Sequence, residues 1–220
     1  MSERRYNIRL EGARSLLMHH DNITGGERVK KWQKDPKNRE LSVAGDDRSP
    51  AWVWLTYCYH DAKRFVIPSD NMMTTMREGA KRVSTGKRGT FKAQSQSGIL
   101  VDQESWALEV NGKSVPWEPF AALADEVDFE KHESTAKEYG FELFVKRARV
   151  GMAKHVRVRP RFEGWACEGS VTILDDSITK DILGDILSQA GRFAGLGDWR
   201  PSSPKSPGPF GTFTATVEAA

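Results

Sequence analysis

The segment from Thr179 to Gly197 carries the clearest helical pattern in this chain. Its apolar residues recur three and four positions apart and so share one helical face; they are Ile182, Leu183, Ile186, Leu187, Ala190 and Phe193. Thr179 is a candidate N-cap, and Gly195 and Gly197 end the pattern as residues that tolerate positive φ. The fold prediction is built around this helix.

A second helix is predicted to begin near Asp70. Pro68 disfavours helix at the residue before it, and Ser69 or Asp70 can cap the turn that follows. The apolar face of this helix consists of Met72, Met73, Met76, Ala80 and Val83. A methionine stripe at this spacing is typical of a core.

Alternating apolar residues predict several strands around these helices. The first begins at Tyr6; residues 51–60 and 64–68 form a hairpin; residues 156–162 and 165–173 are paired strands; and the last strand runs from Phe213. In residues 156–162 the arginines project to the face opposite the valines, which favours a solvent-facing arginine row that tracks phosphates. An ordinary open sheet face would look the same.

The core elements follow the order strand, helix, strand, strand, helix, strand. This order predicts an α+β fold with a ferredoxin-like (RRM-like) βαββαβ core, in one domain that spans residues 1–220. Residues 22–50 are expected to form a long basic loop, which can contain a short helix, and residues 102–142 a long acidic insertion. Many functions use this fold, so topology alone decides little.

Composition limits the location of the protein and its chemistry. No apolar run among the 220 residues reaches membrane-spanning length, and MSERRYNIRL lacks the apolar stretch of a secretory signal, so we expect a cytoplasmic protein with no membrane partner. Cys58 and Cys167 have no CxxC or histidine-rich companion motif, so we expect two half-buried thiols. No cofactor and no metal site are predicted.

Charge is unevenly distributed, although the net charge is only +3. Residues 146–161 contain seven cations and no acid, and a second basic run holds Lys81, Arg82, Lys87, Arg88 and Lys92. Acidic residues concentrate between the two runs. This asymmetry predicts a surface that binds a polyanion, although charge runs also occur on ordinary solvated faces.

The segment GLGDWRPSSPKSPGPFGTF, residues 195–213, connects the last helix to the last strand and holds four glycines and four prolines. Glycine lets backbone N–H groups approach a phosphate, while Arg200 and Lys205 add charge and Trp199 can stack on a base. The prolines stiffen the loop. The alternative is a surface connection whose glycines and prolines only shape turns.

This segment resembles the glycine-rich loop of the repeat-associated mysterious protein (RAMP) superfamily, which supplies backbone and guide-processing subunits of CRISPR effectors. IPSDNMMTTMREGAKR is similar to the segment that opens the first helix in that family. The likeness covers about the outer two thirds of the chain. It implies subunits that line up side by side along a strand as a homo-oligomer or filament. Asp198 and the prolines interrupt the loop, which fits a phage or mobile-element relative as well as an effector subunit.

Non-catalytic binding of single-stranded DNA or RNA is the predicted function. The predicted binding residues are Arg14, Lys81, Arg82, Lys87, Arg88, Arg147, Arg149, Lys154, Arg157, Arg159, Arg161, Gly195, Gly197, Trp199, Arg200 and Lys205. One alternative is a metal-free endoribonuclease of the guide-processing kind, with His19 and His20 as the first catalytic candidates beside Arg14. A further alternative is a virion or assembly protein whose basic and acidic faces pair between subunits.

Overall fold

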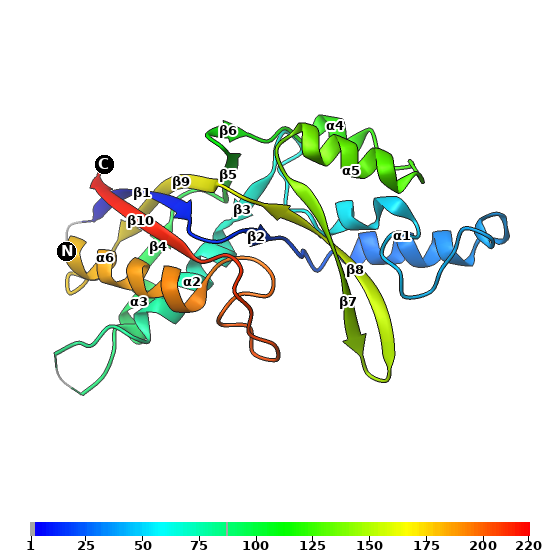
Figure 1. Ribbon diagram of the computed structural model, residues 1–220. Helices are drawn as coiled ribbons and strands as arrows, with labels where there is room; N and C mark the ends of the chain where they lie inside the picture. Colours follow the sequence, from blue (N-terminus) through cyan, green and yellow to red (C-terminus); the bar gives the residue numbers. More distant parts are fainter. Residues whose placement is uncertain (1–2, 87) are drawn as a thin grey trace. The chain divides into compact units, whose positions relative to one another are not determined.

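A computed structural model describes residues 3–86 and 88–220 (Figure 1). The described residues form an α+β protein with two antiparallel sheets, one of seven strands and one of three. The chain divides into two compact units. The first unit contains the residues up to 17 together with 66–114 and 163–220, and the second contains residues 18–65 and 115–162.

The first unit is built on the larger sheet, whose central order is β10-β1-β9-β5-β3. Short strands β4 and β6 pair with β9 and β5 respectively. The seven strands of this sheet are β1 (Arg4–Gly12), β3 (Val66–Pro68), β4 (Ile99–Val101), β5 (Ser105–Val110), β6 (Lys113–Ser114), β9 (Trp165–Ile173) and β10 (Phe213–Ala219). Strand β2 (Leu16–Leu17) also falls in this unit but is a strand of the smaller sheet. The predicted strands at the two chain ends and at residues 165–173 are therefore confirmed.

Helices α2 (Ser69–Ala80), α3 (Lys92–Gly98) and α6 (Lys180–Gln189) lie along one face of this sheet (Figure 1). Both predicted helices are confirmed, and Thr179 caps α6 by accepting a hydrogen bond from the Ile182 N–H. Helix α6 continues as a π-helical turn, Ala190–Ala194, and ends at Gly195 with φ 71°. The backbone of Gly79 on α2 packs directly on α6, because a Cβ there would lie 2.3 Å from the Ile186 carbonyl oxygen.

The second unit combines short helices with one long hairpin. Its elements are α1 (Ile23–Lys34), the 3₁₀ helices η1 (Pro36–Asn38) and η2 (Ala51–Tyr57), α4 (Glu118–Ala121), α5 (Phe129–Glu138), β7 (Glu142–Val150) and β8 (Ala153–Phe162). Its core is aromatic: the ring centroids of Phe65 and Phe120 lie 5.3 Å apart, and those of Phe141 and Phe162 lie 4.6 Å apart. Buried Trp54 donates its indole N–H to Nδ1 of His132 across 3.1 Å.

Residues 51–60 do not form the predicted strand. They contain the 3₁₀ helix η2, in which Ala51 to Leu55 are all buried. A strand that faces solvent on one side would expose every second residue, whereas this segment is covered on all sides. Residues 64–68 do contribute a strand, β3, but it pairs with β5.

Residues 22–50 were expected to form a basic loop that can contain a short helix, and Ile23–Lys34 form such a helix, α1. The side chain of Asn22 caps this helix by accepting a hydrogen bond from the Gly25 N–H. Residues 102–142 are not one insertion: β5 and β6 belong to the large sheet, and α4 and α5 belong to the second unit.

The predicted pairing of residues 156–162 with 165–173 is wrong as well. Strand β8 pairs with β7, whereas β9 pairs with β1, β4 and β5.

No helix in the described part of the chain is long and apolar enough to cross a membrane.

Candidate nucleic-acid interface

The glycine-rich loop, residues 195–213, folds back on its own backbone. Leu196 and Gly211 are joined by a hydrogen bond from the Leu196 N–H to the Gly211 carbonyl, and Gly211 donates to the Ser15 carbonyl. The Gly195 N–H donates to Ala190, and the Asp198 N–H donates to Leu17. These backbone N–H groups therefore donate to carbonyl groups within the loop and in the segments that pack against it. The expected phosphate cradle needs such groups to face a ligand, so this expectation is corrected.

Close backbone packing explains the loop glycines. A Cβ on Gly197 would lie 2.2 Å from the Leu17 carbonyl oxygen, and one on Gly211 would lie 1.8 Å from that of Leu196. Both glycines also have positive φ, 74° and 68°. The sequence feature that indicated phosphate binding thus has a structural cause in the described residues.

The polar residues of this loop differ in exposure. Trp199 is half-buried, with its ring 5.4 Å from that of Phe210. The Arg200 guanidinium donates to the Gly197 carbonyl at 2.9 Å and to the Ser202 hydroxyl at 3.0 Å, whereas Lys205 is exposed. Arg200 therefore stabilises the loop from within.

Exposed Arg14 lies beside this loop in the first unit. Its backbone N–H donates to the Thr212 carbonyl, and its own carbonyl accepts the indole N–H of Trp165 at 2.8 Å. The structure thus brings together Arg14 and the loop residues that the sequence singled out.

The basic run after α2 also belongs to the first unit. Lys81 pairs with Glu78, and the Arg82 guanidinium lies over the Phe193 ring, 4.5 Å from its centroid. Arg88 is exposed, and Lys87 falls outside the described residues. Two of these cations therefore have local partners.

The three arginines of β8 do not form an open row, so that expectation is wrong. Nearly buried Asp47, 5% exposed, accepts hydrogen bonds from Arg157 at 2.8 Å and from Arg159 at 3.1 Å. Arg161 pairs with Glu142. Side chains from outside β8 therefore neutralise this part of the charge run.

Tyr57 completes the surroundings of Asp47. The Arg159 guanidinium lies over the Tyr57 ring, 4.2 Å from its centroid. Burial, and then the negative charge of Asp47, raises the pKa of the Tyr57 hydroxyl above its ordinary value. The phenol is therefore neutral at pH 7, and the arginines balance the Asp47 carboxylate.

Towards the turn of the β7–β8 hairpin the cations are exposed. Residues 147–154, which we call the hairpin tip, include exposed Arg147, Arg149 and Lys154. The cross-strand register places Arg149 opposite Lys154 and Lys146 opposite Arg157. The register therefore concentrates positive charge on the hairpin. Like charges directly opposite one another destabilise an isolated hairpin.

Apolar side chains are exposed on the same hairpin. Met152, in the turn, is 93% exposed and Val145 on β7 is 40% exposed. The hairpin is drawn as a long twisted ribbon in Figure 1. It therefore offers cations and apolar groups side by side.

The two candidate histidines lie in the second unit, each against a tyrosine. The His19 ring stands edge-on to Tyr57 at 4.9 Å, and its Nε2 lies 3.4 Å from Nη2 of Arg159. The His20 ring lies 4.8 Å from that of Tyr59. Arg14, the third member of the predicted catalytic group, belongs to the first unit.

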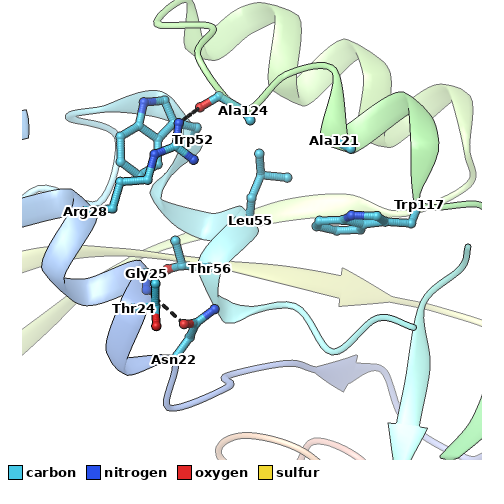
Figure 2. A pocket seen from close by; sticks show the side chains of 10 residues that line it. All are labelled: Asn22, Thr24, Gly25, Arg28, Trp52, Leu55, Thr56, Trp117, Ala121 and Ala124. Carbon is cyan, nitrogen blue, oxygen red and sulfur yellow. Dashed lines mark hydrogen bonds between the residues drawn. The ribbon is translucent and has the colours of Figure 1, made fainter. Parts of the chain in front are cut away.

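A pocket of about 240 Å³ lies between α1, η2 and α4 in the second unit (Figure 2). Figure 2 shows Trp117 on one side of Leu55 and Trp52 on the other, with Arg28 beside Trp52. The Arg28 guanidinium lies 4.2 Å from the Trp52 ring centroid and donates to the Ala124 carbonyl. Trp117 is fixed by a parallel stack on His60, with centroids 3.9 Å apart.

Sequence reasoning missed this pocket because its walls come from three separate segments, residues 22–28, 52–56 and 117–124. Within the part of the chain that the structure describes, no cluster of three or more His, Cys, Asp or Glu side chains could hold a metal ion.

Searches with protein-family models and with curated proteins found no match to this chain.

Proposed function

We propose that this protein binds single-stranded nucleic acid without cutting it, and that the β7–β8 hairpin makes the main contact. The observation that carries the proposal is the register that sets Arg149 against Lys154 at the exposed tip. This arrangement costs stability in an isolated hairpin, and phosphates between the two cations would remove the repulsion.

The charge of the hairpin supports a polyanion as the ligand. Residues 143–162 contain seven Lys or Arg and no Asp or Glu. Three of the seven are paired with Asp47 or Glu142, so the contact with phosphate falls to the residues near the tip. Arg147, Arg149 and Lys154 are its principal members.

The exposed apolar groups favour a single strand over a duplex. Met152 and Val145 lie among the cations, where they can contact base faces. Base faces are stacked inside a duplex and accessible in a single strand. Phosphate contacts from the cations together with apolar contacts to bases give binding with little sequence preference.

A ferredoxin-like core and a relationship to the RAMP superfamily are the fold-level part of the proposal. They are supported by the sheet order β10-β1-β9-β5, with α2 after the first strand and α6 before the last. The glycine-rich loop between α6 and β10 occupies the position on which the resemblance rests. In this proposal copies of the protein line up along the bound strand.

Fluorescence anisotropy with labelled single-stranded DNA, single-stranded RNA and duplex DNA tests the function. The test variant replaces Arg147, Arg149 and Lys154 with alanine, and the control replaces Lys30, Lys31 and Lys34 of α1, which removes the same charge. If the tip binds three phosphates, the slope of log affinity against log salt falls by about 2 in the test variant only. Equal losses in both variants, or preference for the duplex, would contradict the proposal.

A second candidate, the endoribonuclease, is favoured by one contact. His19 is exposed and lies beside the Arg159 guanidinium, so a proton-transfer group occurs next to a cation that Asp47 already pairs. This function predicts a discrete RNA product that disappears in His19→Ala and persists in His20→Ala. The strands from the anisotropy experiment can be recovered and run on a gel. RNA that remains intact after incubation with the wild type would exclude the endoribonuclease function.

A further inference from the structure

The α4 side of the Trp52–Trp117 pocket carries negative charge, whereas the α1 side carries Arg28. Residues 114–130, which include α4 and the segment leading to α5, contain five acids and no Lys or Arg; the acids are Glu118, Asp125, Glu126, Asp128 and Glu130. The Asp125 side chain at the rim is 94% exposed and pairs with Arg28. The pocket itself is lined mainly by apolar and aromatic groups. The α4 side of the pocket therefore suits an apolar group that is flanked by cations.

The pocket is smaller than most small-molecule sites. Its volume of about 240 Å³ is below the range of roughly 300–1,000 Å³ that is typical of small-molecule sites. Its two tryptophans are positioned by their own contacts, Trp52 by Arg28 and Trp117 by His60. A flexible, polarisable side chain that contacts aromatic rings well would fill such a space.

This chain carries such a side chain. Met152 at the hairpin tip is 93% exposed and lies between Arg149 and Lys154. Methionine adapts to irregular gaps and makes favourable sulfur–aromatic contacts. The same exposure means that Met152 does not occupy the pocket of its own molecule.

We propose that the hairpin tip of one copy inserts Met152 into the Trp52–Trp117 pocket of a second copy. The cations of the tip then face the acids of residues 114–130. Because tip and pocket are different surfaces, the contact is heterologous, and each further copy can add in the same way. This self-association rests on the pocket, the methionine and the charges.

Its regulation rests on the proposed function. The same cations cannot contact phosphates and the acidic rim at once. Nucleic acid therefore displaces the neighbouring copy from this contact, and the contact between tip and pocket forms mainly when no strand is bound.

Sedimentation velocity over a concentration series, without nucleic acid, tests the self-association. The wild type is expected to associate at low salt and to dissociate at high salt, because the contact is partly electrostatic. Met152→Ser removes the apolar tip and Ala121→Tyr fills the pocket. Both sites are exposed and neither change alters charge, so circular dichroism is expected to show native folding.

Mixing the two variants gives the sharpest result. Each variant alone stays monomeric, but the mixture keeps one working tip and one working pocket and therefore forms a two-copy species and nothing larger. Three results would each overturn the inference. The wild type could be monomeric at all concentrations, the mixture could stay monomeric, or the single variants could associate like the wild type.

A short oligothymidylate separates this inference from the proposed function. Ala121→Tyr is expected to bind it as the wild type does, since the hairpin is unchanged, and adding it to the wild type is expected to dissolve the assemblies. Binding without self-association would overturn the inference alone. Self-association without binding would overturn the proposed function and the displacement by nucleic acid, and would leave the contact between copies.

Discussion

Replacing Asp47 with alanine is expected to destabilise the second unit strongly. The carboxylate is 5% exposed and accepts hydrogen bonds from Arg157, Arg159 and the Val158 backbone N–H, the last at 3.2 Å. It therefore joins residues 45–47 to the edge of β8. Alanine can accept none of these hydrogen bonds.

The magnitude follows from the burial of the arginines. Removing one partner of a buried ion pair costs about 3–5 kcal/mol, because a charge remains without its counter-ion. The Arg159 side chain is 11% exposed and belongs to this class, whereas that of Arg157, at 31%, is partly solvated. We therefore expect a loss of about 3 kcal/mol, at the lower end of that range.

Urea unfolding followed by tryptophan fluorescence measures this loss. With a typical dependence on urea of about 1–3 kcal/mol per molar, the midpoint is expected to fall by about 1–3 M. Asp125→Ala is the matched control, since it also breaks an Asp–Arg pair of the second unit but at a side chain that is 94% exposed. If both variants shifted the midpoint equally, the structural role given to Asp47 would be refuted.

Two further predictions concern stability. Gly211→Ala is expected to lower the free energy of unfolding, measured in urea, by about 2 kcal/mol or more, because a Cβ would lie 1.8 Å from the Leu196 oxygen at positive φ. Gly112→Ala is the control, since Gly112 has φ 76° and no atom within 4 Å of a Cβ. This control is expected to lose only the conformational part, about 1–2 kcal/mol. Burial lowers the pKa of His132 in the folded protein. As the pH falls below about 6.5, the unfolded chain therefore binds a proton at this residue before the folded chain does. His132 then reduces the free energy of unfolding by at most about 1.4 kcal/mol per pH unit. Urea midpoints at pH 7.5 and 5.5 are expected to differ less in His132→Gln than in the wild type; an equal difference would contradict this.

The elements with regular periodicity were predictable from the sequence. Helices α2 and α6 show apolar residues at helical spacing, and β1, β9 and β10 show alternation, so local pattern and tertiary burial agree. Residues 51–57 were predicted wrongly because their aromatic and β-branched residues favour strands, whereas the segment forms a 3₁₀ helix whose first five residues are buried. The bounds of helix α1 within the expected loop were not predicted, because Gly25 and Gly26 weaken its helical signal.

The candidate site was less predictable, because its contacts join distant positions. Asp47 and Arg157 are 110 positions apart, and a single sequence does not indicate that they pair. The glycine-rich loop misled for a related reason: positive φ and close backbone packing require glycine just as phosphate binding does. Composition identified the basic segment correctly but could not separate paired from exposed cations.

That separation changes how the charge run of residues 146–161 should be interpreted. Its C-terminal part, Arg157 to Arg161, stabilises the fold, because Asp47 and Glu142 neutralise it. Its N-terminal part surrounds the turn, where Arg149 faces Lys154 and Met152 is almost fully exposed. If the proposed function holds, stability and binding depend on different residues of one hairpin. Substitutions in the first group should change the unfolding midpoint, and those in the second should change affinity and its salt dependence.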